Sequence, residues 1–82
     1  MIEVLFFARL RESLDLARLA LELSEPTTVG GVKAQLAARG ANWQALFAAG
    51  QVLAAVNQEL ANDATPIRPG DEVAFFPPAT GG

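Results

Sequence analysis

The sequence predicts an α+β domain in which one main helix packs on one face of a mixed β-sheet. Residues 2–8 and 72–76, near the two ends of the chain, are rich in the β-branched and aromatic side chains that strands favour. Between them, Val29, Val32 and Leu36 recur at helical spacing. One helix flanked by strands covers a single side of their sheet. The other side is therefore expected to lack a cover from this chain.

Two strands are expected before the helix, over residues 2–8 and 18–23. In the second strand, leucines at every other position alternate with polar or small residues, which is typical of a half-buried strand. The connection over residues 9–15 is short, with room for one or two helical turns, so the two strands are predicted to form a hairpin. The helix-facing core is expected to contain apolar residues of the strands and the helix: Val4, Phe6, Leu21, Leu36 and Phe75.

The main helix is expected to begin after Thr28, whose side chain can cap its N-terminus, and to end near Gly40. Its first turn contains Gly30 and Gly31, each of which costs roughly 1 kcal/mol relative to Ala in a helix. We interpret this pair as a place where the helix approaches a neighbouring element closely. A phosphate-binding loop is not indicated, because the Gly-x-x-x-x-Gly-Lys spacing is absent.

The second half of the chain is expected to return to the sheet. Residues 43–47 indicate a second, short helix, and residues 52–57 indicate a third strand. Leu60 is expected on a brief fourth strand, and residues 72–76 form the last one. Asp71 is expected to cap the turn that precedes this last strand.

Composition excludes several classes of function. The 82 residues include no cysteine and no histidine, so thiolate or imidazole metal sites and the commonest catalytic bases and nucleophiles are ruled out. The net charge is -3 and the basic residues are scattered, which argues against binding to nucleic acid or anionic membranes. No apolar run approaches the ~18 residues of a membrane helix, and no secretory signal is visible. We expect a cytoplasmic protein with no metal site, no bound cofactor and no catalytic side chains of its own.

The C-terminal segment carries one reactive group that composition does not count, the terminal carboxylate. We divide the chain into a folded domain over residues 1–76 and an extended, flexible tail over residues 77–82. Pro77 and Pro78 favour extended geometry that directs the tail away from the domain. The final Gly81 and Gly82 lack Cβ atoms, so they can thread a channel too narrow for any side chain.

Residues 69–78, Pro-Gly-Asp-Glu-Val-Ala-Phe-Phe-Pro-Pro, followed by the terminal Gly81-Gly82, resemble the MoaD family, the small subunit of molybdopterin synthase. Residues 2–8 and 53–58 match that family too, so the resemblance spans essentially the whole chain. A terminal Gly-Gly alone is a weak signal, whereas Phe-Phe-Pro-Pro combined with it is specific. The resemblance implies a ubiquitin-like β-grasp fold, which agrees with the element order above.

The resemblance also implies a mechanism. An E1-like adenylyltransferase of the MoeB type uses ATP to adenylate the Gly82 carboxylate, and sulfur then replaces the adenylate to give a thiocarboxylate. The large synthase subunit, of the MoaE type, receives the tail in an expected heterotetramer. Two sulfur transfers there convert cyclic pyranopterin monophosphate to the molybdopterin dithiolene. The chain would be an enzyme only as the sulfur-donating subunit of this sulfurtransferase.

Strand alternation predicts where these partners dock. If Val73 and Phe75 face the helix, Phe76 points to the opposite face, and Phe7 does the same from the first strand. These two strands are neighbours in a β-grasp sheet, so both rings are expected in one exposed apolar patch, with Leu60 as a further candidate. The tail residues beside it are the remaining predicted partner contacts: Pro77, Pro78, Ala79 and Thr80.

Three other functions remain open. The chain can be a sulfur carrier of another pathway, such as the thiamine type, or a protein modifier that joins Gly82 to target lysines. It can also be a binding module that uses the uncovered sheet face without its tail. A thiocarboxylate terminus, covalent adducts on other proteins, or full activity without Gly81-Gly82 would distinguish these functions.

Overall fold

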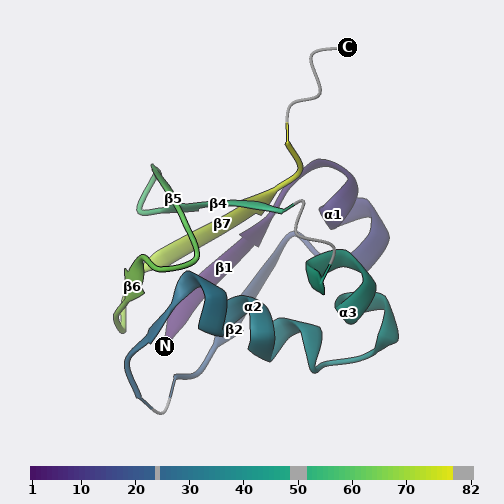
Figure 1. The fold of residues 1–82 in the computed structure, drawn as a ribbon. Helices are drawn as coiled ribbons and strands as arrows, with labels where there is room; N and C mark the ends of the chain where they lie inside the picture. Colours follow the sequence, from purple (N-terminus) through teal and green to yellow (C-terminus); the bar gives the residue numbers. More distant parts are fainter. Residues whose placement is uncertain (24, 49–51, 79–82) are drawn as a thin grey trace.

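The computed structural model describes residues 1–23, 25–48 and 52–78. Figure 1 shows how the helices and strands of these residues are arranged. In chain order they are β1 (Ile2–Phe6), α1 (Ala8–Leu14), β2 (Arg18–Leu21), β3 (Thr27–Thr28), α2 (Val29–Ala37), α3 (Ala41–Ala48), β4 (Leu53–Val56), β5 (Glu59–Ala61), β6 (Pro66–Ile67) and β7 (Glu72–Phe76).

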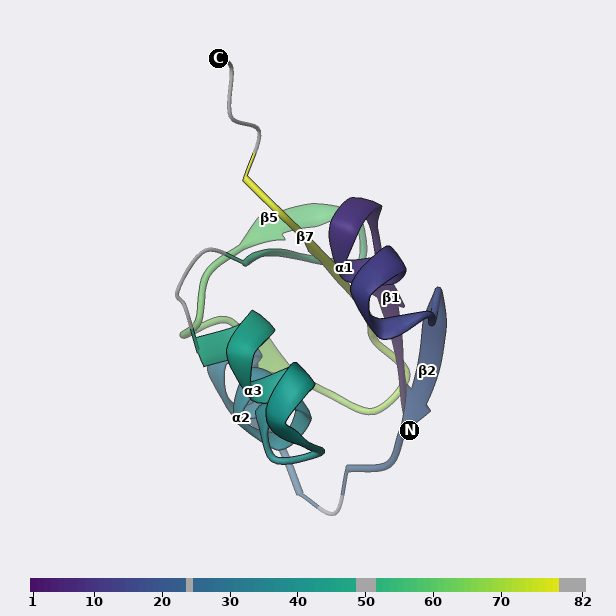
Figure 2. The same ribbon diagram turned by 90° about the vertical axis from the view of Figure 1, so that its right-hand side faces the viewer.

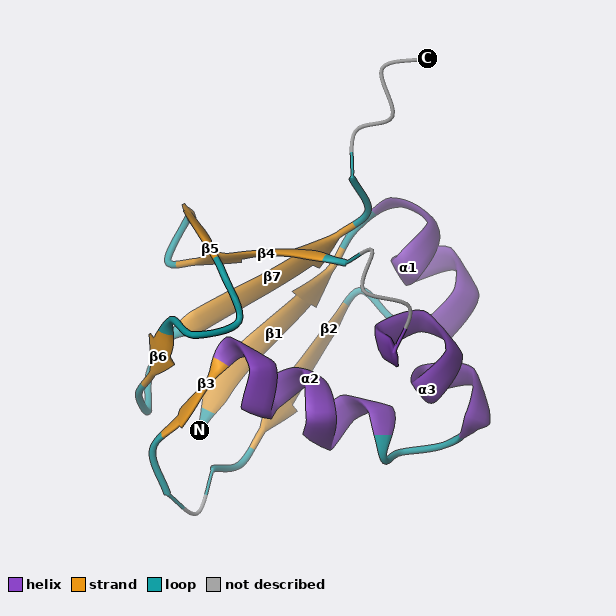
Figure 3. Ribbon diagram, viewed as in Figure 1, coloured by secondary structure: helices purple, strands orange, loops and turns teal. Residues whose placement is uncertain are grey.

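The main sheet has five strands in the order β2-β1-β7-β4-β5. The central pair, β1 and β7, runs parallel with Phe6 opposite Phe75, and the other neighbours are antiparallel. Figure 3 shows the helices on one side of this sheet. The mixed sheet and its one-sided helical layer confirm the predicted α+β class.

The core lies between the sheet and the helices. Val4, Phe6, Val73 and Phe75 are at most 1% exposed on the strands, and Leu36 of α2 is fully buried against them. Leu10 from α1 and Phe47 from α3 join the same cluster, so all three helices contribute to it. We call the sheet face that they cover the inner face.

The core prediction is confirmed for Val4, Phe6, Leu36 and Phe75 and is wrong in degree for Leu21. Leu21 packs against the core but is only half-buried. Its strand, β2, is the edge of the sheet, so no further strand shields its outer side.

The start of α2 agrees with the prediction. The Thr28 side chain accepts a hydrogen bond from the Gly31 backbone N–H at 3.1 Å, which satisfies one of the free donors at the helix start. A Cβ on Gly30 would lie 3.2 Å from the backbone oxygen of Asp63, and a Cβ on Gly31 would overlap the Thr27 side-chain oxygen. The glycine pair therefore marks a close approach of the helix to its neighbours, as expected.

Two predicted strand ends need correction, and one small sheet was not predicted. The first strand ends at Phe6 instead of residue 8, because Ala8 takes a left-handed conformation with φ of 53° and begins α1. The second strand ends at Leu21 instead of residue 23. A separate two-stranded sheet, in which β3 pairs with β6, was not expected, since two residues are too few to show a periodicity.

Candidate functional site

The outer face of the sheet, opposite the helices, carries a row of side chains contributed by five strands. The register aligns Leu5 of β1 with Ala74 of β7, Ala74 with Ala55 of β4, and Ala55 with Leu60 of β5. Arg18 of β2 ends the same row next to Leu5. These residues alternate with core residues along their strands, which is why they share the outer face.

A second row lies nearer the end of β7. Phe76 pairs with Leu53, and the Phe7 backbone N–H donates to the Phe75 carbonyl at 3.1 Å, which fixes Phe7 beside this end of β7. Phe7 is 46% exposed, Leu53 40% and Leu60 77%, while Phe76 is half-buried. We call the apolar residues of the two rows together the outer patch: Leu5, Phe7, Leu53, Ala55, Leu60, Ala74 and Phe76.

The opposite end of the outer face is acidic. Glu3 lies opposite Glu72, and Glu3 forms an ion pair with Arg18 at 3.7 Å. The outer face therefore changes from carboxylates at the beginning of β7 to apolar side chains at its end. The apolar end of the outer face is therefore the end at which the chain leaves the sheet after β7.

The beginning of β7 is held in place by the preceding turn, which Asp71 was predicted to cap. One carboxylate oxygen of Asp71 accepts from the Arg68 backbone N–H at 2.8 Å, and the other accepts from the Asn57 side chain at 3.1 Å. The Asn57 side-chain oxygen in turn accepts from the Glu72 N–H at 3.0 Å. These contacts confirm the predicted cap and tie the β4–β5 turn to the first residue of β7.

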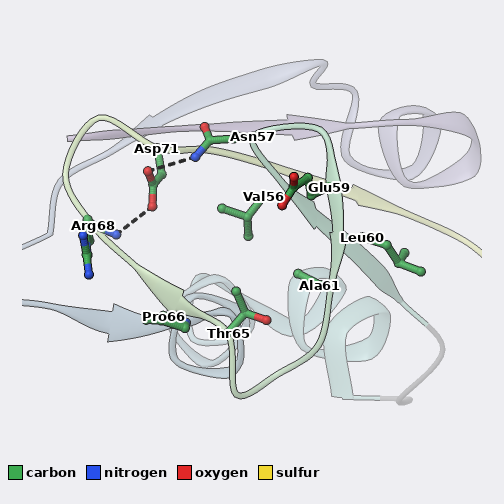
Figure 4. A pocket seen from close by; sticks show the side chains of 9 residues that line it. All are labelled: Val56, Asn57, Glu59, Leu60, Ala61, Thr65, Pro66, Arg68 and Asp71. Atoms are coloured by element: carbon green, nitrogen blue, oxygen red, sulfur yellow. Dashed lines mark hydrogen bonds between the residues drawn. The ribbon is translucent and has the colours of Figure 1, made fainter.

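A hollow of about 310 Å³ lies beside this turn. Figure 4 shows Val56 pointing into it from β4, whereas Leu60 points away from it. The hydrogen bond from the Arg68 backbone, with that from Asn57, lowers the pKa of Asp71 below its ordinary value. A carboxylate that stays ionised is a poor proton donor near neutral pH, so Asp71 is better suited to holding the turn than to acid catalysis.

Within residues 1–23, 25–48 and 52–78, no three potential metal-ligating side chains (His, Cys, Asp or Glu) come together. None of the helices in these ranges is long and apolar enough to cross a membrane.

The structure brings together some of the predicted site residues. Phe7 and Phe76 lie at the same end of the outer face, and Leu60 lies in the adjacent row. Pro77 and Pro78 follow directly and are half-buried. Ala79, Thr80, Gly81 and Gly82 lie outside the described residues. The role of these residues in binding or reaction stays a prediction.

Sequence reasoning missed Leu53 as a member of this surface. Leu53 is exposed because it alternates with buried Ala54, and it meets Phe76 through the pairing of β4 with β7. The alternation was visible in the sequence, but the pairing partner was not.

Comparison with known proteins gives a consistent result. The model described as the ThiS family matches residues 4–82. The molybdopterin synthase sulfur carrier subunits of Escherichia coli (strain K12) and Haemophilus influenzae are 44% and 40% identical to this chain, with 100% of each chain covered. Among solved structures, SAMP1 from Haloferax volcanii superposes with a TM-score of 0.74 at 25% identity, over 99% of this chain and 98% of that one. The superposition agrees with the β-grasp fold.

Proposed function

This chain belongs to the ThiS family, and on that basis we propose that it carries sulfur on the C-terminal carboxyl group of Gly82 for molybdopterin synthesis. The full-length identity of 44% to a molybdopterin synthase sulfur carrier subunit supports this pathway over the thiamine type. The observation that carries the proposal is the apolar outer patch, which lies where β7 leads into the Gly-Gly terminus. The proposed docking surface therefore adjoins the strand that leads to the reactive end of the chain.

The chemistry begins with activation, because a free carboxylate is a poor acyl donor. An E1-like adenylyltransferase joins the Gly82 carboxylate to the AMP part of ATP and releases pyrophosphate. A sulfur donor then displaces AMP, and the terminus becomes a thiocarboxylate. In the large synthase subunit the sulfur passes to cyclic pyranopterin monophosphate, and two such transfers yield the dithiolene of molybdopterin. ATP is used by the activating partner, and this chain binds no cofactor.

The tail residues of this chain place the Gly82 carboxyl carbon at the reaction site and allow it to enter a narrow channel. The tail from Pro78 to Gly82 reaches ~15–17 Å when extended, enough to enter a channel in a partner while the domain stays outside. Gly81 and Gly82 suit the narrow part of such a channel, since neither has a side chain. Holding the reacting carbon in the right place is itself a large contribution to rate.

The outer patch is the proposed docking surface for the large subunit and, in turn, for the activating enzyme. Phe7, Leu53 and Phe76 offer apolar side chains that are only partly covered, close to the root of the tail. Aromatic side chains that become buried at an interface are the residues most often found to dominate affinity. The related protein of Escherichia coli is a subunit of molybdopterin synthase, which supports an assembly of this chain with at least one other chain.

Protein modification is the alternative that a specific observation favours. One similar solved structure, at 25% identity, is that of SAMP1, a small archaeal modifier protein. A protein modifier joins its own C-terminus to lysine side chains of its targets. Lys33 is the only lysine of this chain. Its ammonium group donates to the Asp63 carboxylate at 2.7 Å and to the Val52 carbonyl at 3.0 Å, so its availability as a conjugation target is reduced.

Two variants of the terminus test the proposal. Deleting Gly82, or adding one residue after it, moves the reacting carbon relative to the catalytic groups of the partner. Both variants should keep the melting temperature of the parent protein and lose dithiolene production in a reconstituted synthase. Normal production by either variant would contradict the carrier mechanism, and covalent adducts on other proteins would favour the modifier.

A further inference from the structure

A shallow groove lies at the root of the tail, on the α1 side of β7. Its volume is about 230 Å³, and Ala8, Arg9, Pro77 and Pro78 line it. Figures 1 and 2 show α1 and the end of β7 at the same end of the molecule. We propose that Arg9 in this groove pairs with a carboxylate of the protein that receives the tail. This inference rests on the proposed function, because it assumes such a protein.

The backbone holds Arg9 beside the two prolines. Ala8 has a φ of 53°, in the left-handed region, which costs an L-residue roughly 1–2 kcal/mol. On either side of it, the Phe7 N–H donates to Phe75 at 3.1 Å and the Leu10 N–H donates to Phe7 at 3.2 Å. The chain therefore turns sharply from β1 into α1 at this point. Strained backbone of this kind persists where the surrounding structure fixes it, and such places cluster at functional sites.

The charge of Arg9 is not neutralised within the part of the chain that the structure describes. The ion pairs there are Arg18 with Glu3 and Lys33 with Asp63, and the Arg9 side chain is exposed. Glu3 and Glu72, which lie opposite each other in β1 and β7, are at the other end of the sheet. Although the net charge of the chain is -3, Arg9 at the root of the tail has no ion-pair partner among the described residues. The planar guanidinium matches a carboxylate with two parallel hydrogen bonds.

The length of the tail decides whether Arg9 can contact the small-molecule substrate at the reaction centre or only a carboxylate of the partner protein. With the tail extended in a partner's channel, the Gly82 carboxyl lies ~15–17 Å from the start of Pro78. An arginine beside Pro78 cannot span that distance while it stays in the groove. A carboxylate at the mouth of the channel, against the groove, is within its range. The groove therefore fits an acidic side chain of the partner protein rather than the anionic substrate.

Charge reversal tests this pairing, with a matched variant elsewhere on the surface. Arg9→Glu and Arg39→Glu change the net charge equally. Arg39 lies over the Trp43 ring, 4.8 Å from its centroid, on the helical side of the molecule. Binding to the large subunit of molybdopterin synthase should weaken about tenfold for Arg9→Glu at low salt, mostly through slower association, and much less in about 1 M salt, where the Debye length is short. Arg39→Glu should bind like the parent at both salt concentrations.

The possible results separate this inference from the proposed function. Equal affinities of Arg9→Glu and the parent, or equal losses for the two variants, would overturn the pairing while leaving the carrier mechanism intact. Reduced sulfur transfer by Arg9→Glu at unchanged affinity would also overturn it, since a contact with the anionic substrate would then be indicated. A parent protein that does not bind the large subunit would overturn the proposed function itself.

Discussion

Two adjacent residues of β7 show how differently the two faces of one sheet are used. Phe75 is fully buried on the inner face, and its ring meets that of Phe47 edge-on with centroids 5.3 Å apart. Phe76 lies on the outer face, half-buried, and pairs with the exposed Leu53. The residue type is the same, and only the parity differs. A bulky side chain therefore serves stability on one face and is available for docking on the other.

The largest effect is expected from Phe75→Ala. Removing a fully buried ring from the inner face leaves a cavity and should cost about 3–5 kcal/mol of unfolding free energy. Much of the stability of a small domain would then be lost. Chemical denaturation followed by circular dichroism measures this cost. A loss below about 1 kcal/mol would show that the inner face is not the core.

Leu36→Ala tests the same face from the helix. Leu36 is fully buried where α2 meets the sheet, so its truncation should cost about 2–5 kcal/mol. Gln35→Ala, at an exposed position of the same helix, is the matched control and should stay within about 0.5 kcal/mol of the parent. Equal stability of the two variants would mean that α2 packs through another side.

Phe76→Ala tests the outer face. Truncation of an aromatic side chain that becomes buried on docking should cost about 2 kcal/mol of binding free energy, or more than tenfold in affinity for the large subunit. The melting temperature should change little, because the ring is not part of the core cluster. Titration and scanning calorimetry measure the two quantities. If stability falls by as much as binding, Phe76 behaves as a core residue and the docking surface lies elsewhere.

The smallest effect concerns the turn at the other end of β7. The pKa of Asp71 is lowered in the folded state by hydrogen bonds from Arg68 and Asn57, so its ionised form favours folding. This contribution is present above the unfolded pKa, near its ordinary value of 3.8, and is lost as the pH falls through the lower folded pKa. Asp71→Asn should therefore flatten the acid side of the stability profile. An unchanged slope in denaturation below pH 4 would contradict the role of the carboxylate.

The contrast between the faces could be predicted from the sequence, because alternation along a strand depends only on that strand. Phe75 and Phe76 are assigned to opposite faces without knowledge of their neighbours. Leu53 could not be assigned to the outer patch in this way, since its proximity to Phe76 comes from the pairing of two distant strands. The half-burial of Leu21 likewise depends on the position of β2 at the edge of the sheet.

The groove at the tail root was hidden from sequence reasoning for a different reason. It depends on the left-handed conformation of Ala8, which places Arg9 beside Pro77 and Pro78. Alanine rarely adopts that conformation, and no residue pattern around it signals the turn. Glycine or asparagine at this position would have been a visible signal.

The most direct test of sulfur carriage is the intact mass of the chain after incubation with an E1-like adenylyltransferase, ATP and a sulfur donor. The expected product is heavier than the parent by the difference between one sulfur and one oxygen atom, and fragmentation places that difference on Gly82. Omitting ATP should prevent the change, because the carboxylate must first be adenylated. An unchanged mass in the complete reaction, or a gain on any residue other than Gly82, would contradict the proposal that this terminus carries sulfur.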